Sequence, residues 1–371
     1  MQWRSGTVLR EVRRWPGAVE YAVALGPGDT TVPPEQAAAT EVRALAYTRM
    51  VGEPVPGDRV LLNASALLKG LGTGGLAFVV AVPDRLPRDP EPGPGHIVKA
   101  RYTPLQQMFL AVDEQDSPHH DRLAEADDLA GMPVVVADLH SALPAVVAGL
   151  RTDRPETTVA YVMTDGGALP AAFSRAVAGL RDAGWLAATV SVGQAFGGDL
   201  EAVTVHTGLL AARHVVGADV AVVTQGPGNV GTGTRWGYSG VAVAEALHAA
   251  HVLGGRPVAA LRVSEGDRRE RHHGISHHSR TAYGRALLAP AALPVPDLPG
   301  AFGALVRNQA RDLVATASVE LDAVVVDLTG LADALRRSPV ALRTMGRGLE
   351  EDAAAFLAAA AAGRYAASLL G

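Results

Sequence analysis

Two segments of this chain carry residue types that could do chemistry, and the first is a glycine-rich stretch over residues 226–233. It follows the apolar, β-branched run 220–224, and a helical pattern begins at about Ser239. Glycine lets a backbone approach a ligand closely, and helix starts offer unpaired N–H groups to anions. The pattern therefore predicts a small-molecule site, and we expect the backbone of residues 226–233 to line its main pocket.

This stretch matches the dinucleotide-binding pattern G-x-G-x-x-G only in part. It follows a predicted strand, but that strand is the fourth of its sheet, and residues 232–237 delay the helix. Glu265, the candidate for a ribose-binding acid, comes 34 residues after Gly231, where about 20 is typical. A dinucleotide site, another phosphate site and a purely structural turn all stay open, and the cofactor is not identified. The candidate cofactor-binding residues are Gly226, Gly228, Asn229, Gly231, Gly233 and Glu265.

The second segment is a histidine-rich run that holds four of the chain's 12 histidines. They are His272, His273, His277 and His278. Histidine titrates near neutrality and serves as a base, an acid or a metal ligand. We take His277 and His278 as candidate catalytic residues. The alternative is structural, namely a helix cap or salt bridges with nearby acids.

Two further catalytic candidates follow other predicted strands, where the ligands of parallel sheets bind. His140 follows the first strand, and Asp165 closes the second and precedes two glycines. Capping of a helix is the structural alternative for Asp165. A metal on the histidine run would need a further ligand from another loop, such as Asp165, Asp199 or His140. The sequence assigns no metal ligand.

The elements that position these residues are apolar runs alternating with amphipathic stretches. Strands that are apolar on both faces and alternate with helices are typical of a buried parallel sheet with helices on both sides. We therefore predict a Rossmann-like, three-layer α/β domain over residues 133–371, ending in a helix. Prolines 290, 294, 296 and 299 break this pattern. The six apolar runs are 134–139, 158–163, 188–192, 220–224, 258–263 and 323–328.

Residues 1–82 show a different pattern. Short β-rich runs are separated by proline and glycine turns, which favours a small antiparallel barrel or sandwich. We predict a β-barrel domain over 1–82 and a linker and connecting segment over 83–132, whose first part is rich in proline.

Composition excludes several classes of partner. The net charge is −5, so the chain lacks the basic balance of a general nucleic-acid binder. It has no cysteine, no apolar run of about 18 residues that could span a membrane, and no apolar core of a signal peptide at its start. We expect a cytoplasmic protein with a small anionic or nucleotide-like ligand and no nucleic-acid or membrane partner. Homo-oligomerisation is left open.

Three motifs carry a resemblance to a known family. They are residues 195–201, with Gly197-Gly198-Asp199, residues 226–240, and residues 273–281. Together they resemble the bacterial family catalogued as domain of unknown function 3866. The resemblance spans most of the chain and implies the same two-part layout, but it supplies no activity, ligand or catalytic residue.

Three hypotheses for the function follow. The first is an enzyme that binds a small anionic or nucleotide-like ligand at the glycine-rich loop and uses histidine for acid–base chemistry. The second is a non-catalytic nucleotide-sensing or partner-binding protein, and the third is a metal-dependent hydrolase. The sequence does not decide whether the protein is an enzyme. We expect at least one of the four histidines to reach the pocket that the glycine loop lines.

Overall fold

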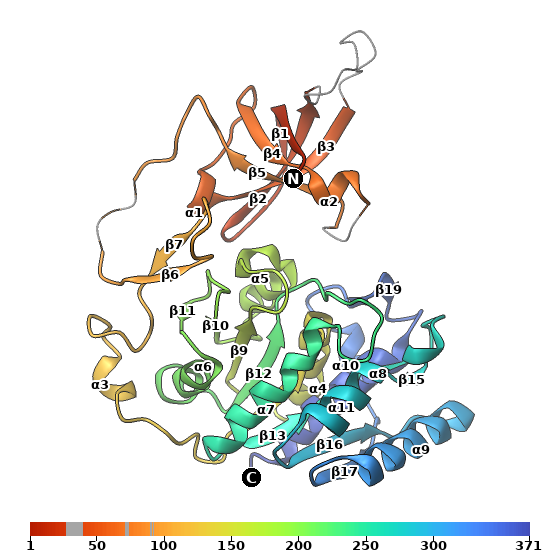
Figure 1. Cartoon of the computed structure of the whole chain (residues 1–371). Coiled ribbons are helices and arrows are strands. Elements are labelled where there is room, and N and C mark those ends of the chain that lie inside the picture. Colours follow the sequence, from red (N-terminus) through yellow and green to blue (C-terminus); the bar gives the residue numbers. More distant parts are fainter. Residues whose placement is uncertain (27–39, 71–73, 90, 92) are drawn as a thin grey trace. The chain divides into compact units, whose positions relative to one another are not determined.

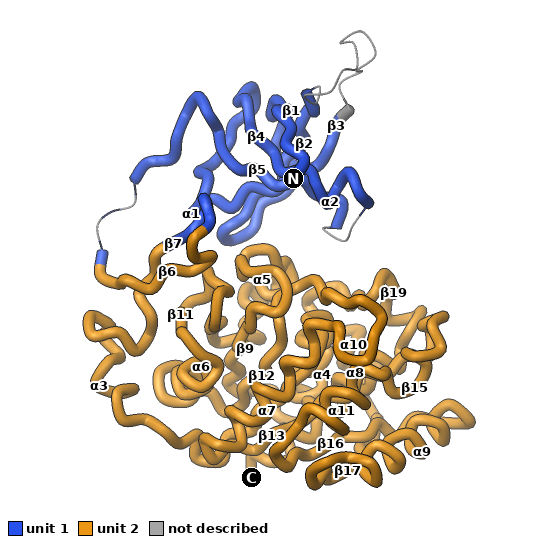
Figure 2. The backbone as a smooth tube through the Cα atoms, in the orientation of Figure 1, with its two compact units in different colours: residues 1–93, 103–107 blue, residues 94–102, 108–371 orange. Residues whose placement is uncertain are grey.

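The chain divides into two compact units in the computed structural model, which describes residues 1–26, 40–70, 74–89, 91 and 93–371 (Figure 2). The first unit comprises residues 1–93 and 103–107, and the second comprises 94–102 and 108–371. Residues 90 and 92 of the proline-rich segment lie outside the described residues. The second unit thus takes in part of the segment that the sequence assigned to a linker.

The first unit is a closed five-stranded barrel in the order β1-β2-β3-β5-β4. Neighbouring strands are antiparallel except for the parallel pair β3–β5. Val8, Tyr21 and Val60 pack inside it. Closure leaves no unpaired strand edge, and the barrel expected from the sequence is confirmed. The strands are β1 Trp3–Trp15, β2 Ala18–Leu25, β3 Thr40–Tyr47, β4 Arg59–Asn63 and β5 Leu76–Ala81, with helices α1 Thr48–Val51 and α2 Ser65–Leu68.

The second unit is built on an eight-stranded sheet in which all paired strands are parallel. Its order is β11-β10-β9-β12-β8-β13-β16-β17, which confirms the predicted α/β fold (Figure 1). The strands are β8 Pro133–Ala137, β9 Val159–Thr164, β10 Ala188–Ser191, β11 Leu200–Glu201, β12 Val220–Gln225, β13 Arg256–Ala259, β16 Ala291–Pro296 and β17 Leu321–Val326.

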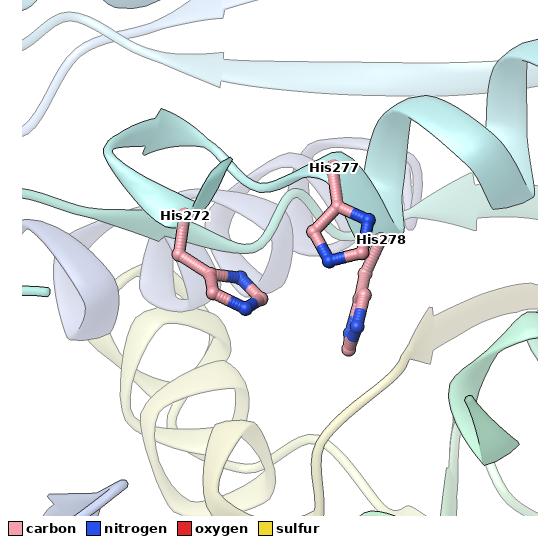
Figure 3. A group of neighbouring side chains, drawn as sticks. All are labelled: His272, His277 and His278. Atoms are coloured by element: carbon pink, nitrogen blue, oxygen red, sulfur yellow. The ribbon is translucent and has the colours of Figure 1, made fainter. Parts of the chain in front are cut away.

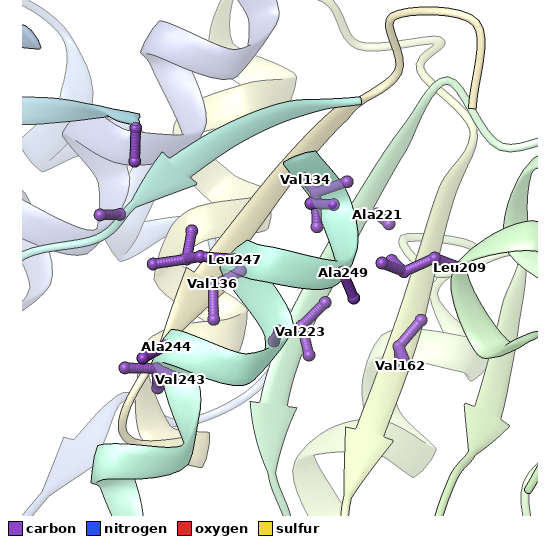
Figure 4. Packing of buried hydrophobic residues seen from close by; sticks show 14 of the residues in the cluster. Val134, Val136, Val162, Leu209, Ala221, Val223, Val243, Ala244, Leu247 and Ala249 are labelled. Carbon is purple, nitrogen blue, oxygen red and sulfur yellow. The ribbon is translucent and has the colours of Figure 1, made fainter. Parts of the chain in front are cut away.

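Helices cover both faces of this sheet. Val134 and Val136 of β8 face one side, where they join a core with α6, α7 and α9 (Figure 4). Val135 and Ala137 face the other side, where they join a core with α4, α5, α10 and α11. This alternation explains why the central strands β8 and β12 are buried over their whole length. The helices are α4 Leu143–Asp153, α5 Arg175–Asp182, α6 Val205–Ala211, α7 Val243–Val252, α9 Gly300–Thr316, α10 Leu331–Arg336 and α11 Ala353–Ser368.

Shorter elements complete the second unit and its connections. Two of them carry the histidine run: β15 and α8 follow each other in the chain, and β15 pairs with β14. The strands are β6 Ile97–Lys99, β7 Gln107–Phe109, β14 Val263–Ser264, β15 Gly274–Ile275, β18 Arg343–Thr344 and β19 Arg347–Gly348, and the helices are α3 His120–Leu123 and α8 His277–Thr281.

One prediction about the sheet is wrong, because strand β16 contains two of the prolines taken as breakers. A proline removes a ladder N–H and is tolerated where no partner awaits it. The pairing of β16 with β13 is the single pair Val258↔Ala292. The backbone N–H groups of Ala291 and Asp297 donate to the β17 side, so the nitrogens of Pro294 and Pro296, which alternate with them, point to the β13 side. They lie there beyond the end of the ladder with β13, so no ladder bond is lost.

Helices α4 and α11 pack at very close range, because each has a glycine facing the other's backbone. A Cβ on Gly149 would collide with the carbonyl oxygen of Ala360, and one on Gly363 with that of Val146. We expect Gly149→Ala to lower the free energy of unfolding by about 1–3 kcal/mol, the usual cost of overpacking, although alanine is the better helix former. Denaturant unfolding measures this. An unchanged or raised stability would contradict the packing described.

Candidate functional site

The carboxyl end of β8 is where the order of the sheet places a site. The strand that follows β8 in the chain, β9, lies on one side of β8 in the sheet. The strand that follows β12, which is β13, lies on the other side of β8. Open α/β sheets bind ligands at such a switch point, outside the carboxyl ends of the strands. Asp138 directly follows β8, and Arg262 lies shortly after β13.

Three histidines converge beside this edge. His272 ends a short 3₁₀ helix, and His277 and His278 begin α8, whose N-cap Ser276 accepts a hydrogen bond from the His278 backbone N–H. One ring nitrogen of each histidine lies within 4.8 Å of one ring nitrogen of each of the others. The three rings are turned toward one another (Figure 3). His277 and His278 are the candidates chosen from the sequence, and the structure places His272 of the same run beside them.

Each of the three imidazoles keeps a ring nitrogen free of protein partners in the described part of the chain. Nδ1 of His272 lies 2.8 Å from the Ser276 hydroxyl, and Nδ1 of His278 lies 2.9 Å from a guanidinium nitrogen of Arg262. Nε2 of His277 is buried without any hydrogen-bond partner. An unsatisfied buried nitrogen costs free energy and indicates a missing partner.

Asp138 and Arg262 form a buried charged group behind His278. The Arg262 guanidinium donates to Asp138 at 3.4 Å, and the His278 Nδ1 lies at 3.4 Å from the same carboxylate. The Asp138 and Arg262 side chains are only 7% and 8% exposed. Burial alone would raise the pKa of Asp138, but the Arg262 charge and the hydrogen bonds with His278 and Arg262 outweigh it and lower that pKa. Asp138 is therefore a carboxylate.

Tyr238 fixes the position of His278 from the other side. Its ring stacks on the imidazole at 3.8 Å between centroids and 7° between planes, and its hydroxyl donates to the His278 carbonyl oxygen at 2.8 Å. Tyr238 closes the glycine-rich segment, just before the 3₁₀ turn at Ser239–Ala242 that leads into α7. The glycine-rich segment and the histidine run are thus joined through this stack.

Electrostatics keep two of the histidines neutral near pH 7. Burial, helped by the positive charges of Arg262 and Arg269, lowers the pKa of His272 to about 3. Burial, together with the charges of His278 and Arg271, lowers the pKa of His277 to about 4. A neutral imidazole has the lone pair that a metal ion requires.

The glycines of residues 226–233 serve several local roles. A Cβ on Gly226 would collide with the Ala168 carbonyl oxygen, so this glycine lets the loops after β9 and β12 pack together. Gly228 and Gly233 have φ of +97° and +81°, which favours glycine. Gly231 forms a β-bridge with Tyr238.

Asn229 and Glu265 lie near polar partners at the same edge. The side-chain oxygen Oδ1 of Asn229 accepts from the side-chain amide of Gln225 at 3.2 Å and from the Ser239 hydroxyl at 2.9 Å. Glu265 is exposed, and its backbone N–H donates to Asp352 at 3.0 Å. Gln225 and Ser239, which flank the glycines, line a cavity with Asp138. That the glycine backbone itself binds a ligand stays a prediction.

Asp165, His140 and His273 make contacts other than those of the three-histidine cluster. Asp165 is exposed and accepts a hydrogen bond from the backbone N–H of Gln194 at 2.9 Å. Both ring nitrogens of buried His140 have partners, at 3.0 Å to Tyr161 and 2.6 Å to Ser174. His273 is exposed and lies edge-on to Phe302. Asp199, offered as an alternative metal ligand, instead pairs with Arg181.

Burial of His140 predicts a pH dependence of stability. Burial lowers the pKa of His140 to about 4, below the ordinary value of about 6.5. As the pH falls from 6.5 to 4, the unfolded chain therefore binds this proton first, and stability decreases by up to about 3 kcal/mol from this residue. We expect His140→Gln to flatten that slope in denaturant unfolding measured at several pH values. The matching change at exposed His251 should leave the slope as it is, and an equal slope in both variants would contradict the prediction.

The sequence contained a signal for two residues that pattern analysis missed. Asp138 and Arg262 are charged residues near the ends of otherwise apolar runs, 134–139 and 258–263. Because charges are rarely fully buried without partners, a charge at the end of an apolar run indicates that some polar partner exists, although not which one. Tyr238 carried no such signal.

The fold and the site define a class of protein: a β-barrel followed by an α/β domain with a histidine cluster at the carboxyl edge of its sheet. A family model described as "Protein of unknown function (DUF3866)" matches residues 43–363, and the chain belongs to this family. Neither the curated proteins nor the solved structures contain a significant match to the chain. Within the described residues, every helix is too short or too polar to cross a membrane.

Proposed function

We propose that this protein is a metal-dependent hydrolase in which His272, His277 and His278 bind one divalent transition-metal ion. The observation that carries the proposal is the convergence of three imidazoles whose ring nitrogens lie within 4.8 Å of one another. One of these rings, that of His277, has a buried nitrogen without a partner in the part of the chain that the structure describes. Neutral imidazoles are ligands that suit zinc, and Zn²⁺ is the ion we expect.

The spacing suits such an ion after a small adjustment. Zinc lies about 2.0–2.1 Å from imidazole nitrogen, so two ligands of a tetrahedral site lie about 3.4 Å apart. Three protein ligands leave the fourth position to water or substrate, as in catalytic zinc sites, whereas structural sites use four protein ligands. The cluster therefore favours catalysis over a structural role.

Asp138 suits the role of a carboxylate that orients a ligating histidine. Ligating histidines usually donate their second N–H to a carboxylate or carbonyl, which fixes the tautomer. Nδ1 of His278 lies within hydrogen-bond distance of both Asp138 and Arg262, and the tautomer of His278 decides which bond forms. A protonated Nδ1 donates to Asp138, whereas an unprotonated Nδ1 accepts from Arg262. Ligation through Nε2 requires the protonated Nδ1, and so selects the contact with Asp138.

The arrangement accounts for hydrolysis in the following way. A metal ion held by imidazoles lowers the pKa of its water and polarises a substrate oxygen. In this chain the three imidazoles would hold the ion, Asp138 and Tyr238 would orient His278, and Arg262 adds a positive charge next to the cluster. Positive charge beside the reacting group stabilises the negative charge that develops during hydrolysis.

Metal analysis followed by hydrolysis assays tests this proposal. The full chain is stripped with a chelator, reloaded with Zn²⁺ or Co²⁺ and freed of excess metal. We expect about one equivalent of ion per chain, and metal-dependent hydrolysis of p-nitrophenyl acetate or p-nitrophenyl phosphate. Less than stoichiometric retention would refute the metal site, and a metal-loaded protein that is inert toward both esters would refute the hydrolase assignment.

A further inference from the structure

A cavity lies at the switch point itself, next to the histidine cluster. Its walls come from the ends of β8 and β13, from the hairpin β18–β19 and from the first turns of α11. Asp138 and Arg262 line it and also contact His278, so the cavity and the cluster share two side chains. Crevices at this position are where α/β sheets bind small molecules.

The two arginines of this cavity have donors that the protein does not use. Arg262 bonds through one guanidinium nitrogen, to Asp138 and His278. Arg347 uses Nε toward Asp352 and one terminal nitrogen toward Asp267 and Ser264. Arginine has donors on three nitrogens. In the described part of the chain, therefore, Nε and one terminal nitrogen of Arg262, and one terminal nitrogen of Arg347, have no acceptor.

The carboxylates of the cavity, in contrast, are already engaged. Asp138 is held by Arg262 and His278. Asp352 accepts from the Ser264 hydroxyl at 2.6 Å, from the backbone N–H groups of Glu265 and Gly266, and from Arg347. The polar part of the wall thus has spare donors and no carboxylate without partners, which suits an oxyanion rather than a cation.

The rest of the cavity wall is apolar, and it therefore suits a ligand whose oxyanion is attached to an apolar group. Ala142, Ala355 and Phe356 contribute to it, as does Met345 from the turn of the hairpin. Met345 has φ +49° and precedes Gly346 at φ +85°, so it sits in a tight two-residue turn between β18 and β19. An apolar pocket with a few convergent polar groups is the usual form of a small-molecule site.

We infer that this cavity binds the oxyanion group of a small organic substrate, a carboxylate or a phosphate, through Arg262 and Arg347. As an assignment of substrate class, the inference rests on the proposed hydrolase function. A cation on the three histidines would add positive charge beside Arg262 and draw the same anions. The apolar wall would hold the short carbon part of the substrate.

Calorimetric titration with inorganic phosphate and with propionate tests the inference. The first arm uses the full chain freed of metal, so that no anion binds through an ion, and the second uses the Zn²⁺-loaded protein. We expect saturable binding of one or both probes in the metal-free arm; the probe with the higher affinity identifies the group as phosphate or carboxylate. Arg347→Lys should weaken it about ten-fold, because lysine keeps the charge but loses the planar guanidinium that Asp352 and Asp267 hold in place while its remaining terminal nitrogen meets the anion.

Two pairs of variants separate binding from a loss of fold. Arg343→Lys on the same hairpin is the control for Arg347→Lys, since Arg343 is exposed and does not line the cavity. Ala355→Leu fills the cavity from the partly exposed side of α11 and should abolish binding, whereas Ala353→Leu, two residues earlier and exposed, should not.

Absence of saturable binding, or equal binding in Ala355→Leu and Ala353→Leu, would overturn the inference. The proposed function is judged separately, by metal retention. Anion binding that depends on Arg347 in a chain that retains no metal would support the anion site and refute the metal-dependent hydrolase.

Discussion

Replacing His277 by alanine is expected to remove tight zinc binding from this protein. His277 has a buried ring nitrogen that no group among the described residues satisfies, and its ring lies 4.9 Å and 4.4 Å, between centroids, from those of His272 and His278. Loss of one of three ligands should weaken the affinity by more than the 10–100-fold that changes around a ligand typically cost.

Thermal or denaturant unfolding with and without zinc gives the second readout. A ligand present at about 1,000 times its Kd stabilises the native state by about 4 kcal/mol, because it binds only the folded chain. We expect this stabilisation in the wild type and its near disappearance in His277→Ala. The control is His273→Ala, an exposed neighbour whose ring faces Phe302. If His277→Ala keeps the full zinc-induced stabilisation, the three-histidine site is wrong.

The fold could be predicted from the sequence because the patterns that indicate its strands and helices are local. Apolar runs mark six of the eight strands. The central strands β8 and β12 are buried over their whole length, whereas the edge strand β17 keeps its apolar run although much of it is not buried. Strand β16 was missed, since Pro294 and Pro296 argue against a strand unless the end of its ladder with β13 is known. The two-residue strand β11 is too short to carry a periodic pattern.

The candidate site could be predicted from the sequence only in part, because its geometry depends on contacts between residues that are far apart in the chain. The histidine run drew attention to the correct segment, but not to which rings converge. Gly274, at φ +73°, turns the chain after His273, and His272 then meets the start of α8 while His273 faces Phe302. Asp138 and Arg262 meet because β8 and β13 are neighbours, although 124 residues separate them in the chain.

The glycine-rich segment shows the opposite case, a strong sequence pattern with several local explanations. Close packing against Ala168 accounts for Gly226, and a left-handed backbone accounts for Gly228. Such roles need glycine whether or not a ligand binds. A glycine motif therefore cannot by itself separate a phosphate site from a tight connection, while the three imidazoles give a more specific chemical indication.

Asp138→Asn is expected to weaken zinc binding about 10–100-fold, the usual cost of removing the group that orients a ligating histidine. The carboxylate accepts from a protonated Nδ1 of His278, and an amide does so less strongly because it carries no charge. The substitution also leaves Arg262, 8% exposed, without its counter-charge, so some loss of stability is expected as well. Co²⁺ titration followed by visible absorption measures the affinity and the geometry of the bound ion.

Two controls distinguish orientation of His278 from general destabilisation. Asp165→Asn removes an exposed carboxylate that holds a backbone turn at residues 193–194, and it should leave the Co²⁺ spectrum unchanged. Gly149→Ala destabilises the fold through the α4–α11 contact without touching the cluster. Should Gly149→Ala weaken cobalt binding and alter its spectrum as much as Asp138→Asn does, the effect at Asp138 would be one of stability alone. A spectrum that changes only in Asp138→Asn ties the carboxylate to the bound ion, because only a group that acts on a ligand alters the ion's coordination.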